Sequence, residues 1–343
     1  MTATRAMPAL FRRLKTVGYD EAFLRRVVLP DWWDDSLAAN PVNRAQVELH
    51  VAQRLGLPLS DLTNSSRALE LPGTKDIRLK RAKPGADRAD VAPGMIVARN
   101  LVALVLPHLR NVPPLPAKLT AGAFRQSILA RRQNVDLAGL LEACWTHGIA
   151  VFHFAPLPSS SKKFAGMAYF EGTRPVVVLA TGYDAPPRLA FYLAHEVGHI
   201  LRGHVGPGGG ILADSDLDGG TEDKQEKEAD ADALEILTDR RNPAFERIYG
   251  LTAEKLRVCA RRFEEQHGVH AGTVALIYGK TASRMPVAAK ALALMNMDAG
   301  ARAIVAEALR RRLLNPIEGS DPSSELPGTV LEVLPVFGVN CLA

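Results

Sequence analysis

Two stretches of this chain carry the pattern that decides its fold: RLAFYLAHEVGHIL at residues 188–201 and EKEADADALEIL at residues 226–237. In the first stretch, apolar residues recur at helical spacing, which predicts a helix that buries one face. Two prolines open this helix and Gly203 ends it. His195 and His199 are four residues apart, so they stack on one face of the helix.

The two histidines and Glu196 form the pattern HExxH. Two imidazoles one helical turn apart can hold one Zn²⁺, and Glu196 beside them is suited to act as a general base. The surrounding residues are apolar, and polar side chains in such a helix need a reason to be buried. The sequence therefore predicts a catalytic zinc site with His195 and His199 as ligands.

A catalytic zinc needs a third protein ligand and one open position. The longer pattern HExxHxxGxxH would require a histidine at position 205, which is valine, and His204 is one residue short. The second stretch predicts a helix on which Glu228 and Asp232 share a face. We take Glu228 as the third ligand and Asp232 as the carboxylate that fixes the tautomer of a ligand histidine. Glu226 is the competing ligand.

The rest of the chain mixes helical segments with a few short strands. Runs of β-branched or aromatic residues predict strands at 149–154, 167–170 and 176–180. A proline-rich connector at 111–116 is a candidate domain boundary. We therefore expect an α+β protein with three parts: a helical domain at 1–125, a zincin-like metallopeptidase domain with a small sheet and active-site helices at 126–285, and a helical extension with an extended tail at 286–343.

The first 125 residues are basic. They hold 19 Lys/Arg and 11 Asp/Glu, a net charge of +8, which leaves −3 on the rest of the chain. The spacing of Ala52, Leu55, Gly56 and Leu62 is that of a helix-turn-helix, although a plain helical hairpin gives the same pattern. A basic linker or exposed arm follows, with Lys75, Arg78, Lys80, Arg81, Lys83 and Arg88. Because such side chains neutralise phosphates, residues 1–125 are a candidate DNA-binding region; an ordinary solvated surface is the alternative.

Composition excludes several classes of protein. Hydrophobic residues make up 47% and charged residues 23%, a globular balance that excludes wholesale disorder. The three cysteines, Cys144, Cys259 and Cys341, are far apart, which excludes a disulfide framework and a CxxC metal site. No uninterrupted run of about 18 apolar residues exists, so we expect no membrane-spanning helix. We expect a cytoplasmic protein.

A glycine-rich acidic loop at 206–223 separates the two decisive helices. Asp214, Asp216 and Asp218 match the first half of a calcium-binding loop, but the twelfth position is Gln225 instead of a bidentate glutamate. We therefore expect a flexible acidic flap near the active site and not a calcium site.

These features together resemble the ImmA/IrrE family of metallopeptidases. Residues 174–180 resemble a strand of that family, 188–201 its LAHELGH-type helix and 226–237 its ExEANxFAxxLL-type helix. Similarity at 148–151, 166–168 and 259–280 extends the resemblance over roughly residues 126–285. Asp230 stands where the family usually has Asn, and Asp232 stands where it usually has an aromatic residue.

The resemblance implies a zinc peptidase-like domain with ligands His195, His199 and Glu228 and with Glu196 as general base. Known relatives cut or inactivate helix-turn-helix repressors in stress responses or mobile-element transfer. We therefore expect a zinc-dependent endopeptidase that cleaves a protein substrate of this kind. The alternative is a DNA-binding transcription regulator whose zinc domain senses or binds without turnover.

Peptide hydrolysis also needs a proton acceptor and a group that stabilises the oxyanion. Glu196 is expected to take a proton from water and pass it to the leaving amine. His204 and Tyr192 are the candidates for stabilising the transition state, and the sequence does not choose between them.

Overall fold

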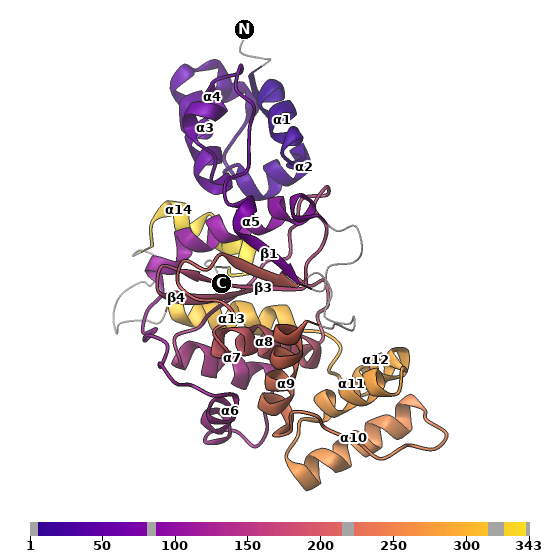
Figure 1. Cartoon of the computed structure of the whole chain (residues 1–343). Helices are drawn as coiled ribbons and strands as arrows, with labels where there is room; N and C mark the ends of the chain where they lie inside the picture. The colour runs from indigo at the N-terminus through magenta and orange to yellow at the C-terminus, as the bar shows by residue number, and fades with distance from the viewer. Residues whose placement is uncertain (1–5, 81–86, 215–222, 315–325, 341–343) are drawn as a thin grey trace.

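The computed structural model describes residues 6–80, 87–214, 223–314 and 326–340 of the 343-residue chain. Within these residues the protein has the predicted α+β fold, with a small mixed sheet of five strands surrounded by helices (Figure 1). The sheet has the strand order β1-β5-β3-β4-β2. Its strands are β1 (Ile77–Lys80), β2 (Ala150–His153), β3 (Gly166–Glu171), β4 (Arg174–Leu179) and β5 (Ile211–Asp214).

The centre of the sheet is the hairpin of β3 and β4, which are antiparallel and turn at Gly172 with a φ of 59°. Outside the hairpin, β2 lies parallel to β4 and β5 lies antiparallel to β3. The predicted strands at 149–154, 167–170 and 176–180 are confirmed as β2, β3 and β4. Strands β1 and β5 were not predicted, because each has only four residues and lies within a stretch dominated by charge or glycine.

Helices cover both faces of the sheet (Figure 1). One layer contains α7 (Leu137–Thr146), α8 (Pro186–Leu201) and α13 (Ala301–Leu313), and the other contains α5 (Arg88–Val105) and α14 (Gly328–Leu331). The residues of β2 and most of those of β4 are buried, which explains their continuous Val, Ala and Phe content. Two further helices, α6 (Ala121–Leu129) and α9 (Lys224–Thr238), lie below the first layer in Figure 1.

The helix at Arg88–His108, which is α5 with the turn after it, is long and apolar enough to cross a membrane. Sixty-one per cent of its most apolar window is buried inside the structure. Because it packs on the sheet and on α3, it has the character of a core helix of a globular fold.

The N-terminal helices lie on the α5 side of the sheet (Figure 1). They are α1 (Ala6–Thr16), α2 (Glu21–Phe23), α3 (Pro41–Leu55) and α4 (Leu59–Thr63). Their buried side chains belong to the same hydrophobic core as the sheet. The predicted boundary after residue 125 therefore does not divide the fold, because β1 and α5 come from the first 125 residues and build the sheet and its cover.

A second, smaller core lies among α10 (Ala253–His267), α11 (Ala271–Thr281) and α12 (Met285–Leu294). The predicted boundary after residue 285 cuts this three-helix unit at its last helix. The C-terminal tail is also not wholly extended, because Phe337 is buried against Phe152 and Phe154 of the main core. Single turns of helix complete the described fold: Leu24–Val28, Asp35–Ala39, Thr74–Asp76, Leu106–His108 and Leu334–Phe337.

Candidate metal centre

Helix α8 brings His195 and His199 together on the face that the sequence predicted. Both side chains are completely buried, and their Nε2 atoms lie 3.1 Å apart. The helix is buried along most of its length because it packs on β3, β4, α7 and α9. The HExxH pattern therefore forms a compact pair of imidazoles inside the fold.

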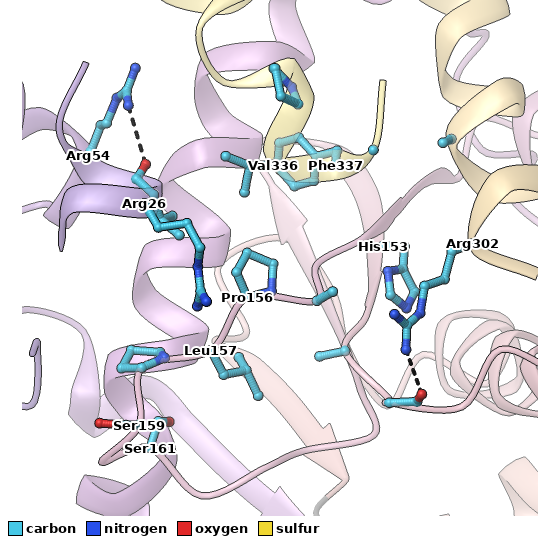
Figure 2. Close-up of a pocket in the computed structure, with 18 of the residues that line it drawn as sticks. Arg26, Arg54, His153, Pro156, Leu157, Ser159, Ser161, Arg302, Val336 and Phe337 are labelled. Carbon is cyan, nitrogen blue, oxygen red and sulfur yellow. Dashed lines mark hydrogen bonds between the residues drawn. The ribbon is translucent and has the colours of Figure 1, made fainter. Parts of the chain in front are cut away.

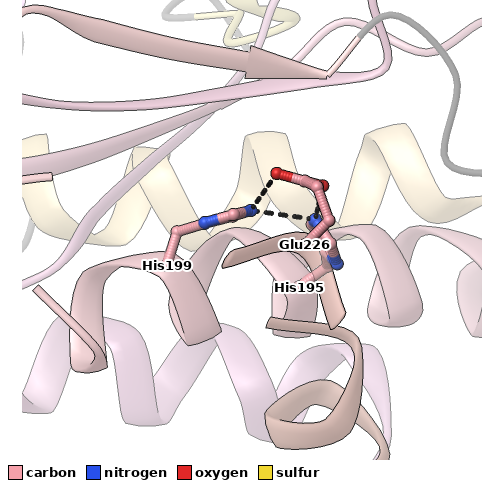
Figure 3. A group of neighbouring side chains, drawn as sticks. All are labelled: His195, His199 and Glu226. Atoms are coloured by element: carbon pink, nitrogen blue, oxygen red, sulfur yellow. Dashed lines mark hydrogen bonds and ion pairs between the residues drawn. The ribbon is translucent and has the colours of Figure 1, made fainter. Parts of the chain in front are cut away.

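The carboxylate that joins the two histidines comes from Glu226, in the first turn of α9 (Figure 3). Its Oε2 lies 3.4 Å from Nε2 of His195, and its Oε1 lies 3.4 Å from Nε2 of His199. The prediction of Glu228 as third ligand is therefore wrong and the competing Glu226 takes this place. Two residues correspond to about 200° around a helix, so only one of the two glutamates can face α8.

The spacing of the three groups fits a tetrahedral metal ion. Ligand atoms about 2.0–2.1 Å from a tetrahedral zinc lie about 3.3 Å from one another. The two nitrogens lie 3.1 Å apart, and each is 3.4 Å from a different oxygen of the Glu226 carboxylate. With one ligand atom from each residue, the three atoms lie within 4.8 Å of one another. The set is therefore a possible metal-binding triad, and its carboxylate needs only a side-chain rotation to place one oxygen near both nitrogens.

The hydrogen bond of His195 to α9 determines which ring nitrogen faces the site. Nδ1 of His195 lies 2.9 Å from Oδ1 of Asp230. An ionised carboxylate only accepts hydrogen bonds, so Nδ1 of His195 donates, and Nε2 of the neutral ring carries a lone pair. This lone pair faces Glu226, which is the orientation required of a metal ligand.

A chain of two hydrogen bonds fixes His199 in the same way. Nε2 of His204 lies 3.1 Å from Oε2 of Glu228, so His204 donates to this carboxylate. Its Nδ1 then accepts from Nδ1 of His199, at 2.9 Å. Nε2 of His199 is thereby left as an acceptor. Two lone pairs and a carboxylate converge on one point, and they repel one another unless a cation lies between them.

Glu226 is ionised in this environment. Burial by itself would raise the pKa of this carboxyl group, but hydrogen bonds and charge from the two adjacent histidines lower it below its usual range. This lowering applies when the rings carry protons on Nε2, the position that a bound cation would take instead. The group therefore carries the negative charge that a divalent cation requires.

Asp232 was predicted to fix a ligand histidine, and this prediction is wrong. Its Oδ2 accepts from Nε of Arg202 at 2.6 Å, and its Oδ1 accepts from Arg202 and Arg241 at 2.7 and 2.6 Å. Asp230 takes the predicted role because it, and not Asp232, faces His195. The sequence offered no way to choose between two aspartates on one acidic helix.

Glu196 is 1% exposed, and its carboxylate lies against Gly166, the first residue of β3. A Cβ atom at position 166 would overlap this carboxylate. The glycine therefore provides the space for Glu196 between α8 and the sheet. Sequence reasoning noted the similarity at 166–168 without recognising this contact.

The two candidates for transition-state stabilisation have other partners. His204 lies between His199 and Glu228, so its ring supports a ligand from behind. The hydroxyl of Tyr192 accepts a hydrogen bond from Nε of Arg188 on the same helix, at 3.2 Å. Neither contact directs a donor toward the converging ligand atoms.

The predicted basic arm is partly internal. Arg78 in β1 donates to the carbonyl of His204 at 2.9 Å, and Lys80 pairs at 2.5 Å with Asp223, the residue that caps α9. These two contacts hold both ends of the loop between α8 and α9 to the sheet. The basic side chains of β1 therefore bind groups of this acidic loop. Arg78 and Lys80 do not belong to a free basic arm. Residues 81–86 lie outside the described residues, as do Asp216 and Asp218 of the calcium-like pattern.

The helix-turn-helix prediction corresponds to α3 and α4. The second helix has five residues, LSDLT, and none of them is Lys or Arg. The guanidinium of Arg13 binds the carbonyls of Asp61, Leu62 and Asn64 at its end. This geometry favours the helical hairpin, because a recognition helix must present side chains to bases or phosphates.

No family model matches the sequence, and neither does any curated protein or solved structure.

Proposed function

We propose that this protein is a zinc-dependent endopeptidase of the ImmA/IrrE type, with a zincin-like domain built around α8 and α9. The observation that carries the proposal is the convergence of Nε2 of His195, Nε2 of His199 and the Glu226 carboxylate, with Glu196 next to the first ligand in sequence. This is the ligand set of two histidines and a glutamate that catalytic zinc sites use with one open position.

Each side chain has a distinct task in the proposed reaction. Zinc bound there would act as a Lewis acid toward a peptide carbonyl and toward water. Glu196 accepts a proton from the attacking water and donates it to the leaving amine. Asp230, and the pair His204 and Glu228, hold the imidazoles in the required tautomer.

The proposed substrate is a transcriptional repressor of the helix-turn-helix class, in a stress-response or mobile-element switch in the cytoplasm. The support for the substrate is the resemblance of residues 126–285 to peptidases that act on such repressors. The support for the compartment is that Cys144 and Cys259 are both free thiols.

The test is co-expression with repressors encoded near the gene, comparing the parent with Glu196→Gln. The variant keeps the shape of the side chain but cannot accept a proton, so it should bind zinc and yield no fragments. Glu265→Gln, at an exposed position of α10, is the matched control and should cleave like the parent. Parent-like cleavage by Glu196→Gln would contradict the mechanism.

One observation favours the second candidate, a DNA-binding regulator whose zinc domain binds or senses without turnover. The three ligand side chains and Glu196 are at most 1% exposed, so a substrate has no direct access in this conformation. Under this candidate, Glu196→Gln would retain full biological output, and residues 1–125 would contribute to DNA binding that weakens steeply with salt. If residues 1–125 bound duplex from their own promoter no more tightly than unrelated duplex, that region would act as a scaffold and not as a DNA-binding domain.

A further inference from the structure

A cavity of about 880 Å³ opens where the N-terminal helices meet the sheet and the C-terminal tail (Figure 2). Its lining comes from the helical turn Leu24–Val28 and the residues after it, from Arg54 of α3, from the loops after β2 and β4, from the start of α13, and from the tail. Its size is within the range of about 300–1,000 Å³ that small-molecule sites occupy. None of its lining residues belongs to the metal centre.

The cavity lies at the carboxyl ends of two parallel strands. His153 is the last residue of β2, and Ala180 and Gly182 follow β4 directly. Open sheets with parallel strands bind their ligands beyond these ends, because the loops diverge there and leave room. The position of the cavity therefore agrees with a binding site.

Basic side chains outnumber acidic ones around the cavity. The charged residues that line it are Arg26, Arg54, Lys163, Arg302, Asp31 and Glu332. Arg54 and Glu332 neutralise each other at 2.8 Å, and Nη2 of Arg302 donates to the carbonyl of Gly182 at 2.5 Å. Arg26 and Lys163 are exposed and make no hydrogen bond or ion pair with another described residue. The cavity therefore has an excess of positive charge.

The walls of the cavity are fixed by buried contacts. Arg54 is 3% exposed and donates to the carbonyls of Val27 and Val28, so it holds the N-terminal wall to Glu332 in the tail. The loop after β2 is held in place as well, because the backbone N–H and the hydroxyl of Ser159 both donate to Asp20. A ligand would therefore meet a cavity that is already formed, which reduces the ordering cost of binding.

Apolar side chains face the same space as the basic ones. Pro156 and Leu157 come from the loop, and Val336 and Phe337 come from the tail (Figure 2). Burial, together with the charge of Arg302, lowers the pKa of His153 to about 4, so this ring is neutral at pH 7. The cavity thus offers an apolar surface beside guanidinium groups, which form paired hydrogen bonds with phosphate or carboxylate.

We propose that this cavity binds an organic anion, with its apolar or aromatic body against Pro156, Leu157 and Phe337 and its phosphate or carboxylate group on the side of Arg26 and Lys163. This inference goes beyond the proposed peptidase activity, because it assigns a second ligand site in the same chain. Phosphate and carboxylate groups are both negatively charged, and both present oxygen atoms that accept hydrogen bonds from Arg and Lys.

Calorimetric titration of the full chain in 150 mM salt tests the proposal. The probes are AMP for the phosphate, 4-hydroxybenzoate for the carboxylate, and adenosine as the uncharged counterpart of AMP. We expect saturable binding of at least one anion and at least tenfold weaker binding of its uncharged form. Arg26→Ala and Lys163→Ala should each weaken the binding by about tenfold, since each removes a charge-assisted contact.

Arg12→Ala and Lys118→Ala are the controls, because they remove the same charges at exposed positions outside the cavity. They should bind the anion like the parent. Arg26 and Lys163 have no partners in the described structure, so their replacement should leave the melting temperature unchanged. Failure of both anions to bind at 10 mM, equal binding of adenosine and AMP, or equal losses in the control variants would each overturn the proposal.

Discussion

The metal centre takes its side chains from two helices that are neighbours in the sequence, whereas the basic cavity is closed by contacts such as that between Arg54 and Glu332, 278 positions apart. The centre is buried, and each of its two histidines has a second partner that fixes its ring. The cavity is open, and two of its basic side chains, Arg26 and Lys163, have no partner among the described residues. A site built from local helical spacing can be recognised in a sequence, while a site assembled from distant segments becomes visible only in the fold. The following experiments test this contrast, from the largest expected effect to the smallest.

Glu226→Ala should lower zinc affinity by roughly a thousandfold, since it removes one of three ligands of a site whose metal binding is worth roughly 10–16 kcal/mol. Glu228→Ala should lower it by only about tenfold, because Glu228 acts through His204. Competition with a chelator of known affinity measures both. If Glu228→Ala lost more zinc affinity than Glu226→Ala, Glu228 would be the third ligand, as the sequence predicted.

The sequence could define α8 and the histidine pair because both depend only on the helical period. It could not define the third ligand, because the rotation of α9 depends on its capping by Asp223 and on its close packing at Gly198, where a Cβ would contact the backbone of Ala229. The same limit applies to the choice of Asp230 over Asp232.

In the sheet too, the sequence could predict some strands and not others. The runs that became β2, β3 and β4 are mostly apolar, with polar residues only at their ends, so the sequence was sufficient to predict them. Strands β1 and β5 exist because residues 77–80 and 211–214 pair with each other across the chain, with Ile77 opposite Ile211. Neither short segment has a sequence pattern of its own that indicates a strand, so the sequence did not show that residues before position 125 contribute to the sheet.

On the cavity side, His153 should make the protein less stable in acid. Its folded pKa of about 4 lies below the ordinary value near 6.5, so the unfolded chain binds the proton more readily between these values. Stability from this group is complete above pH 6.5 and falls by about 3 kcal/mol as the pH drops to 4. Urea unfolding of the parent and of His153→Gln, from pH 7 to pH 4, measures the difference between them.

The difference isolates this histidine, because other groups titrate equally in both proteins. The charged groups that act on His153 are Arg302 and Asp184, and both remain in the variant. If the free energy of unfolding of His153→Gln depended on pH as that of the parent does, the ring of His153 would be exposed to solvent. The wall of the cavity would then be less tightly packed than the structure indicates.

Asp230→Ala should weaken zinc binding by roughly 10- to 100-fold, because His195 loses the acceptor that fixes its tautomer. Asp230→Asn keeps an acceptor oxygen and should restore most of the affinity. Asp232→Asn is the contrasting variant: it weakens the contacts with Arg202 and Arg241, so it should lower the melting temperature and leave zinc affinity unchanged. Zinc loss in Asp232→Asn with none in Asp230→Ala would reverse the assignment of the two aspartates.

Gly166→Ala should have a modest effect on stability and a selective effect on catalysis. The added Cβ overlaps the Glu196 carboxylate, and such overpacking costs roughly 1–3 kcal/mol. Because the carboxylate can move where the backbone cannot, we expect full zinc content, a slightly lower melting temperature and at least tenfold slower cleavage of the repressor. Gly328→Ala, where a Cβ meets nothing within 4 Å, is the control and should match the parent in all three. Zinc loss in Gly166→Ala would mean that the glycine supports the ligands themselves. Cleavage at the parent rate would mean that Glu196 does not depend on the space beside β3. The catalytic glutamate, which the HExxH pattern predicts, would then be independent of the sheet, which the pattern does not predict.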